Sequence, residues 1–201
     1  ATNKGSGVEY RNDLDGNRKL ARVRIHGVRA SGFGLHGIVV HGAPADRSQS
    51  GYRDLRITNC VGSDNTHTGI LVTGVFDPAA RAYANENVYI GPCTAFDNSG
   101  APGHHNHSGN GIFLEDADGG MIEYCVAYNN GFLCDFPGGG PIGIWTAVAN
   151  NVTIQFNESH HNRTMDSSAD GGGFDFDGGV TNSIMQYNYS HDNDGAGYLV
   201  Y

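Results

Sequence analysis

The chain has 201 residues, including 31 glycines, and a formal net charge of −9 at pH 7; this length suits one domain spanning 1–201. Residues 1–81 hold 11 Lys or Arg against 7 Asp or Glu, whereas residues 82–201 hold only Arg163 against 14 acids, which argues against a nucleic-acid partner for the second half. No run of 18 apolar residues occurs, so we expect no membrane span.

A unit of 31 to 33 residues repeats along the chain. Its corner position is held, in chain order, by Val28, Cys60, Cys93, Cys125, Asn157 and Asn188. Five residues after each corner stand Phe33, Asn65, Asn98, Asn130, Asn162 and Asn193. Each unit then delivers a glycine followed by an apolar residue, with the glycines at Gly37, Gly69, Gly111, Gly143, Gly173 and Gly197. A fixed period of this length is the signature of stacked structural repeats.

Alternation of side-chain type predicts short strands on both sides of each corner. The side chains expected to point inward are Val23, Ile25, Leu55, Ile57, Val88, Ile90, Val152 and Ile154 before the corners, and Ile38, Val40, Ile70, Val72, Ile112, Leu114, Phe174 and Phe176 after the glycines. A single coil cannot bury its own apolar face, whereas stacked coils close a continuous core. The sequence therefore predicts an all-β solenoid of about six to seven coils, with long loops flanking one sheet.

This pattern resembles the right-handed parallel β-helix family, whose members include pectate lyases and other polysaccharide-active proteins. The resemblance implies an asparagine ladder at one inner corner, which Asn157 and Asn188 match and which Cys60, Cys93 and Cys125 replace. Three cysteines at one repeat position are expected to stack about 4.8 Å apart as small buried side chains, in preference to disulfides or a metal site. The resemblance also implies a polysaccharide or oligosaccharide partner and an extracellular, cell-surface or periplasmic location.

Insertions fall on both sides of the strands that carry the glycine and apolar pair, which together form the Gly-apolar sheet. The middle coils lengthen before these strands, at 99–110, 131–142 and 163–172. The first two coils lengthen after them, at 42–54 and 74–87. Long loops beside a rigid sheet are where solenoids usually place a binding surface, so we expect the site there.

The outward positions of this sheet include Phe113 and Trp145 on adjacent coils, and His41 on an earlier coil. The two rings would form an aromatic shelf suited to the apolar faces of sugars, so we expect them to bind substrate. The alternative is that both rings only pack beneath the inserted loops. Arg163, the one basic residue of the second half, is a further candidate for contacting substrate.

Three acids are expected beside this shelf: Glu115, Asp175 and Asp177. Asp175 and Asp177 are two positions apart on one strand, which separates them by roughly 6.5–7 Å. Glu115 lies two coils from Asp177, a separation of roughly 10 Å. Inverting glycoside hydrolysis uses two carboxyl groups about 6.5–9.5 Å apart, so these acids are candidate catalytic residues. The alternative is a set of solvated surface acids.

A Ca²⁺ site is a second use for acids in this region. Asp166 and Asp170 would supply hard oxygen ligands together with Asp175 and Asp177. The stretch DGGGFD matches the glycine-rich calcium nonapeptide only in part. Ca²⁺ is therefore the candidate cofactor, and Asp166 and Asp170 are its candidate ligands.

A histidine cluster lies in the insertion at 99–110. His105 is the candidate general base, and His104 and His107 are candidate substrate contacts; together they could also form a soft metal site. The alternative is three exposed loop histidines. The histidines of the repeated corner, His160, His161 and His191, are explained first by structure.

The function that these features favour is an enzyme acting on a glycan in a groove over the Gly-apolar sheet. It would be either a glycoside hydrolase or a Ca²⁺-assisted uronate lyase or epimerase. The alternative is a non-catalytic β-helix: an adhesin, fibre or surface-layer segment that binds glycan or associates with itself. The chain begins and ends within coils, so we expect an excerpt of a longer protein, with flanking domains or end-to-end stacking.

Overall fold

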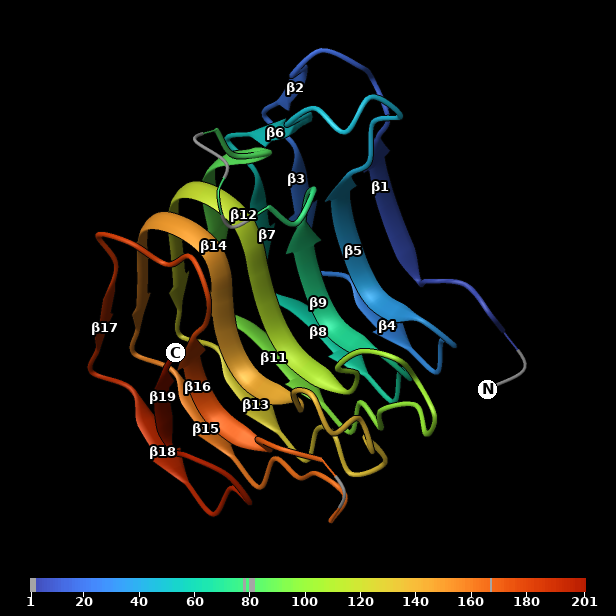
Figure 1. The fold of residues 1–201 in the computed structure, drawn as a ribbon, viewed down its shortest axis with the longest axis vertical. Helices are drawn as coiled ribbons and strands as arrows, with labels where there is room; N and C mark the ends of the chain where they lie inside the picture. The colour runs from blue at the N-terminus through green and yellow to red at the C-terminus, as the bar shows by residue number, and fades with distance from the viewer. Residues whose placement is uncertain (1–2, 78, 80–81, 167) are drawn as a thin grey trace.

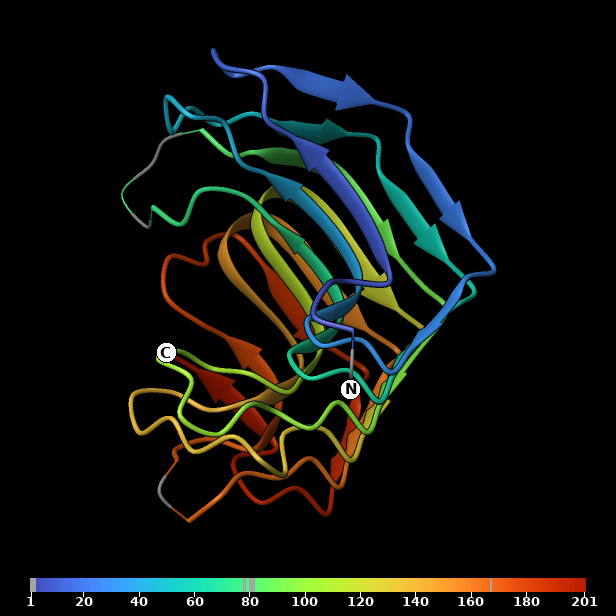
Figure 2. The same ribbon diagram turned by 90° about the vertical axis from the view of Figure 1, so that its right-hand side faces the viewer.

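The computed structural model describes residues 3–77, 79, 82–166 and 168–201 and places them in coils stacked along one axis (Figures 1 and 2). The strands pair in parallel, and the described residues contain no helix. The chain is a parallel β-solenoid of about six turns, which confirms the predicted fold class.

Each coil carries three strand positions. The Gly-apolar sheet contains β1 (Val8–Asn12), β5 (His36–Gly42), β9 (Thr68–Thr73), β16 (Gly172–Phe176), β19 (Tyr198–Val200) and the first halves of β12 (Asn110–Glu123) and β14 (Ile142–Gln155). The second halves of β12 and β14 continue round a corner beside β2 (Lys19–Ala21), β3 (Arg24–His26), β6 (Gly51–Arg53), β7 (Arg56–Thr58), β10 (Asn85–Ile90) and β17 (Ile184–Gln186). A separate six-stranded sheet contains β4 (Arg29–Ser31), β8 (Cys60–Ser63), β11 (Cys93–Phe96), β13 (Val126–Tyr128), β15 (Glu158–His160) and β18 (Tyr189–His191).

A single left-handed residue turns the chain at each edge of the six-stranded sheet. The residue before the corner position has a φ near +54° at Asn59, Tyr124, Phe156 and Tyr187. The residue before the repeated asparagine does the same at Asp64, Asp97, Asn129, His161 and Asp192. Asp and Asn tolerate this conformation because their short polar side chains form local hydrogen bonds. This explains their frequency at the second turn, the one just before the repeated asparagine.

The repeated asparagines form a buried ladder along the axis. Each side-chain amide donates to the Oδ1 of the asparagine on the next coil, from Asn65 to Asn98 at 3.0 Å and from Asn98 to Asn130 at 2.8 Å. Asn130 and Asn162 continue the row, which ends at Asn193. This asparagine ladder lies five residues beyond the corner where the sequence analysis placed one.

The predicted corner row is also present. The amide of Asn157 donates to Asn188 Oδ1 at 2.9 Å, and Cys93 stands in register with Cys60. Cys60, Cys93 and Cys125 are buried and free, as expected for a stack of small side chains, and the loop residue Cys134 is buried and free as well. The row therefore changes from thiols to amides along the axis without interrupting the coils.

Close contact between coils explains the repeated glycine. A Cβ atom on Gly143 would lie 2.0 Å from Ser159 Oγ, and one on Gly111 would lie 2.9 Å from the Ala127 Cβ. The glycine row therefore faces the row of small side chains that follows each corner, and neither row tolerates larger residues.

The core runs through the centre of the coils. Of the side chains predicted to point inward, Val23 is partly buried and the others are at most 8% exposed; all belong to one continuous apolar cluster or pack against it. No helix among the described residues is long and apolar enough to span a membrane.

The predicted insertions flank the Gly-apolar sheet. The described parts of three loops, at 99–110, 131–142 and 163–166 with 168–172, gather side by side at the edge where these strands begin, coloured green to orange in Figures 1 and 2. The described parts of the earlier insertions lie at the opposite edge. The outer face of the Gly-apolar sheet is therefore bounded on both sides by loops.

Candidate functional site

An apolar row follows the outer face of the Gly-apolar sheet. Strand register places Leu71 beside Phe113, Phe113 beside Trp145 and Trp145 beside Asp175. The Phe113 and Trp145 rings are stacked, with centroids 3.5 Å apart and planes 4° apart. With Val39 and three further side chains they form an apolar cluster outside the core.

The aromatic pair is covered. Phe113 and Trp145 are each 3% exposed, and the His107 ring packs edge-on against Trp145 with a centroid distance of 4.9 Å. His107 comes from the first of the three clustered loops. The rings therefore pack beneath an inserted loop and offer little open surface for stacking sugars, so the predicted open aromatic shelf is not present.

A cavity of about 640 Å³ lies over this face of the sheet. This volume is within the range of about 300–1,000 Å³ typical of ligand sites. Phe113, Trp145 and Thr73 are among the sheet residues that line the cavity. The clustered loops contribute further lining residues, among them His104, His107, Gly139 and Asp170. The insertions thus turn an open sheet face into a pocket.

Four carboxyl groups line this cavity. Asp170 comes from the loop at 163–172, and the other three lie on or next to the sheet: Glu115 on β12, Asp175 on β16 and Asp177 just after β16. The Thr73 hydroxyl donates a hydrogen bond to Glu115 Oε2. Burial raises the pKa of Glu115 to about 7 despite this bond, and the charges of Asp116 and Asp177 act in the same direction. Burial also raises the pKa of Asp175 to about 7, and Asp177 adds to the rise. The pocket therefore holds two carboxyl groups that carry a proton near neutral pH.

Unpaired polar atoms concentrate in the same cavity. Among the described residues, five buried side-chain polar atoms lack a hydrogen-bond partner, and three of them belong to residues that line the cavity. These three are His36 Nδ1, Trp145 Nε1 and Asp175 Oδ1. Buried polar groups are normally paired, so an indole donor and a carboxyl oxygen without partners indicate a place for a polar ligand.

A group of histidines forms another part of the cavity lining. The rings of His36, His67 and His104 contact one another edge-on, with centroid distances of 5.7 Å and 4.5 Å. Burial lowers the pKa values of His36 and His107 to about 4, with neighbouring histidines adding to the effect, so both are neutral at pH 7. His36 and His67 were not predicted as site residues, although the sequence has a histidine within two residues of the repeated glycine in each of these two coils.

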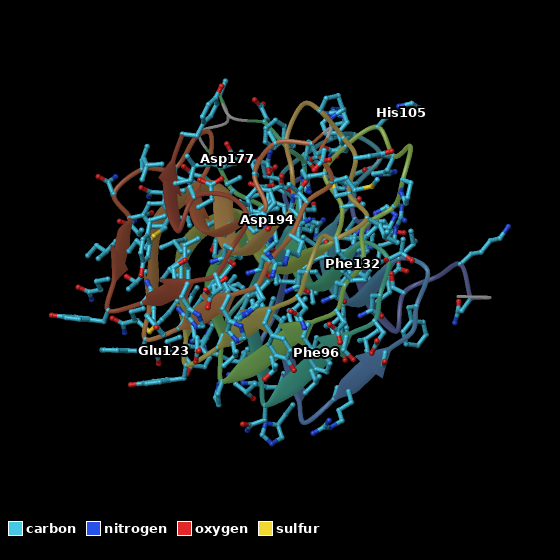
Figure 3. All side chains as sticks on the ribbon, turned by 90° about the horizontal axis from the view of Figure 1, so that it is seen from below. Phe96, His105, Glu123, Phe132, Asp177 and Asp194 are labelled. Atoms are coloured by element: carbon cyan, nitrogen blue, oxygen red, sulfur yellow. The ribbon has the colours of Figure 1, made fainter. Side chains whose placement is uncertain are left out.

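The remaining predicted site residues do not line the cavity. His41 Nε2 lies 3.0 Å from Glu9 Oε1, and Arg163 pairs with Asp194 at 2.7 Å. His105 and Asp166 are exposed loop residues. Figure 3 shows His105 at the outer end of its loop, well separated from Asp177. The structure thus brings together Phe113, Glu115, Trp145, Asp175, Asp177, His104, His107 and Asp170, and leaves four predicted residues outside.

The acids of the cavity do not form a compact set of metal ligands. The described residues contain two groups of three side chains whose ligand atoms lie within 4.8 Å of one another. Neither group includes Asp166, Asp170, Asp175 or Asp177. Ca²⁺ binding at these acids stays a prediction, and no catalytic step is derived through it.

Comparisons with protein-family models, with curated proteins and with solved structures found no match to this chain. The fold defines it as a parallel β-solenoid protein, with a pocket of acids and histidines over one sheet.

Proposed function

We propose that this protein is a glycan-hydrolysing enzyme of the parallel β-helix type, acting on a neutral sugar chain held in the pocket over the Gly-apolar sheet. The observation that carries the proposal is the set of three carboxyl groups that the sheet places in one cavity, Glu115, Asp175 and Asp177, the first two with pKa values raised to about 7. Glycosidases use a protonated carboxyl group together with an ionised one, and an unequal environment is what separates the two roles.

In this proposal Glu115 is the general acid. Its Oε2 accepts a hydrogen bond from Thr73, so Oε1 is free to carry the proton to the leaving oxygen. Asp177 is the general base. It takes a proton from a water molecule as that water attacks the anomeric carbon and the bond to the leaving oxygen breaks.

The spacing supports an inverting reaction. The backbone N–H of Asp177 donates to Thr146 O on β14, the strand that neighbours β12. Two coils correspond to roughly 10 Å between backbones, near the separation of about 6.5–9.5 Å that leaves room for a water molecule. Asp175 and Trp145 supply an unpaired acceptor and an unpaired donor for substrate hydroxyl groups.

The lining favours a neutral substrate. Among the described residues that line the cavity, none is Lys or Arg. A uronate chain would bring further negative charge beside Glu115, Asp175 and Asp177, so a lyase or epimerase reaction would require a cation such as Ca²⁺. A glycan substrate also favours an extracellular, cell-surface or periplasmic location, as the sequence analysis expects.

Product analysis on a panel of neutral and uronate polysaccharides, with and without EDTA, tests the proposal. We expect reducing ends from a neutral glycan at the same rate in EDTA. Unsaturated products that form without EDTA and are absent in its presence would contradict hydrolysis and indicate a cation-dependent lyase reaction instead. Binding without turnover would support the second candidate, a non-catalytic β-helix adhesin, fibre or surface-layer segment. The covered aromatic pair favours this candidate in one respect, because rings that only pack beneath a loop do not form a catalytic subsite.

The pH dependence of kcat/KM checks the role of Glu115. Because burial raises its pKa to about 7, the protonated form is lost as the pH rises through that value. We expect kcat/KM to fall by about tenfold per pH unit above about pH 7. The fall is expected to persist in Asp175→Asn, since Asp175 transfers no proton in this mechanism. A rate that stays constant from about pH 6 to pH 9 would rule out Glu115 as the general acid.

Trp145→Phe checks the role of the indole donor. Phenylalanine keeps the stack on Phe113 and removes an N–H that has no partner, so we expect the free energy of unfolding to change by less than about 1.5 kcal/mol. We expect glycan affinity to fall by about tenfold, the effect of one lost hydrogen bond. Calorimetric titration and urea unfolding measure the two quantities. Phe113→Leu is the opposite control, because it weakens the stack and leaves the donor in place; unchanged affinity in Trp145→Phe would remove the indole from the binding site.

A further inference from the structure

A row of stacked rings follows the outer face of the six-stranded sheet. Phe96, Tyr128, His160 and His191 stand on four successive coils, with ring centroids 4.9, 5.2 and 4.8 Å apart. Figure 3 shows Phe96 on the far side of the molecule from Asp177, so this row is separate from the pocket. The row begins with aromatic side chains and ends with two imidazoles.

The two imidazoles meet a carboxylate. His160 and His191 are paired in strand register on β15 and β18, and Glu158 lies two residues before His160 on the same strand face. Glu158 Oε1 lies 3.1 Å from His191 Nε2 and 4.0 Å from His160 Nε2. One ligand atom from each of the three side chains lies within 4.8 Å of the others, and all three residues are half-buried. Three potential ligands from two neighbouring coils therefore converge on one point.

The second nitrogen of each imidazole already has a partner. His191 Nδ1 lies 2.7 Å from Asp192 Oδ2, and His160 Nδ1 lies 2.7 Å from His161 Nδ1. His161 and Asp192 are the left-handed residues of the second turn, which follow His160 and His191 directly. Metal-binding histidines usually donate this second N–H to a carboxylate or another acceptor, which fixes the ring and leaves Nε2 to the metal.

We propose that Glu158, His160 and His191 bind a divalent transition-metal ion of the Zn²⁺ class. Two imidazole nitrogens and one carboxylate oxygen suit Zn²⁺ and its neighbours, whereas Ca²⁺ takes an all-oxygen shell. The ion takes the place of the proton that His191 Nε2 shares with Glu158, and that proton is released to solvent. The three side chains leave a fourth position for water. Asp192 and His161 orient the ligands. The ion links β15 to β18, so it stabilises the last two coils; this inference does not rest on the proposed function.

Zn²⁺ titration of the whole chain after dialysis against EDTA tests the proposal. We expect the wild-type protein to bind Zn²⁺ at this site, and His191→Gln and Glu158→Gln to lose that binding. Asp192→Asn is expected to weaken it by about 10- to 100-fold. His26→Gln is the matched control, because His26 is an exposed histidine on β3 whose ring bonds to the Thr58 hydroxyl and which belongs to neither cluster of potential metal ligands found among the described residues.

Thermal unfolding gives an independent measurement. Zn²⁺ is expected to raise the Tm of the wild-type protein and of His26→Gln, and to leave the Tm of His191→Gln unchanged. His160→Gln serves as the second variant if His191→Gln does not fold. The proposal is overturned if the wild-type protein binds no Zn²⁺, or if Glu158→Gln and His160→Gln bind it as the wild type does, which would place the ion at the pocket histidines.

Discussion

Glu115→Gln is expected to lower kcat for glycan hydrolysis by about 10²- to 10⁴-fold, the usual contribution of a general acid. Glutamine preserves the volume of the side chain and can still accept the Thr73 hydroxyl, but it has no proton to give to the leaving oxygen. Asp177→Asn is expected to cause a comparable loss, because the attacking water then has no base. Initial rates of reducing-sugar release measure both effects.

A substrate with a good leaving group separates the two roles. An aryl glycoside that needs no protonation is expected to restore most of the rate in Glu115→Gln and none in Asp177→Asn. Glu9→Gln is the matched control, since Glu9 lies on the same sheet and its side chain is 48% exposed beside His41; we expect wild-type rates. Wild-type rates in Glu115→Gln, or equal losses with both substrates, would contradict the assigned roles.

Asn130→Ala is expected to lower the free energy of unfolding by about 3–5 kcal/mol, because several buried partners lose their hydrogen bonds together. Asn130 is fully buried. Its amide donates to Ala95 O and Asn162 Oδ1, and its Oδ1 accepts from the backbone and the side chain of Asn98. Alanine leaves these groups without partners and out of reach of water. Urea unfolding followed by circular dichroism measures the change.

Asn193→Ala is the control for that prediction. Asn193 is the last member of the asparagine ladder and is only half-buried, so water replaces part of what is lost. We expect a loss of about 1 kcal/mol. If Asn130→Ala and Asn193→Ala lowered the free energy of unfolding equally, burial within the asparagine ladder would not determine how much each residue contributes to stability.

The site could be predicted from the sequence in part. Strand alternation and the repeat together place Phe113, Trp145 and Asp175 in one row, and the register confirms it. The same reasoning found Glu115 and Asp177, which line the cavity. His36, the first residue of β5, and His67, just before β9, were not predicted, because only the packing of the loop at 99–110 over this edge makes them part of a cavity.

The sequence by itself determined the coils, because a fixed period and alternating apolar residues leave stacking as the way to bury the inward side chains. Only the tertiary structure decided where the irregular segments lie. The loop at 99–110 has no counterpart in the repeat, and its His107 covers Trp145 through contacts between distant parts of the chain. Likewise, Glu158 and His191 come from neighbouring coils and meet only in the folded chain. Burial in the folded chain also gives Glu115 its raised pKa. These properties depend on side-chain packing and on the local dielectric environment, neither of which can be predicted from the spacing of residues in the sequence.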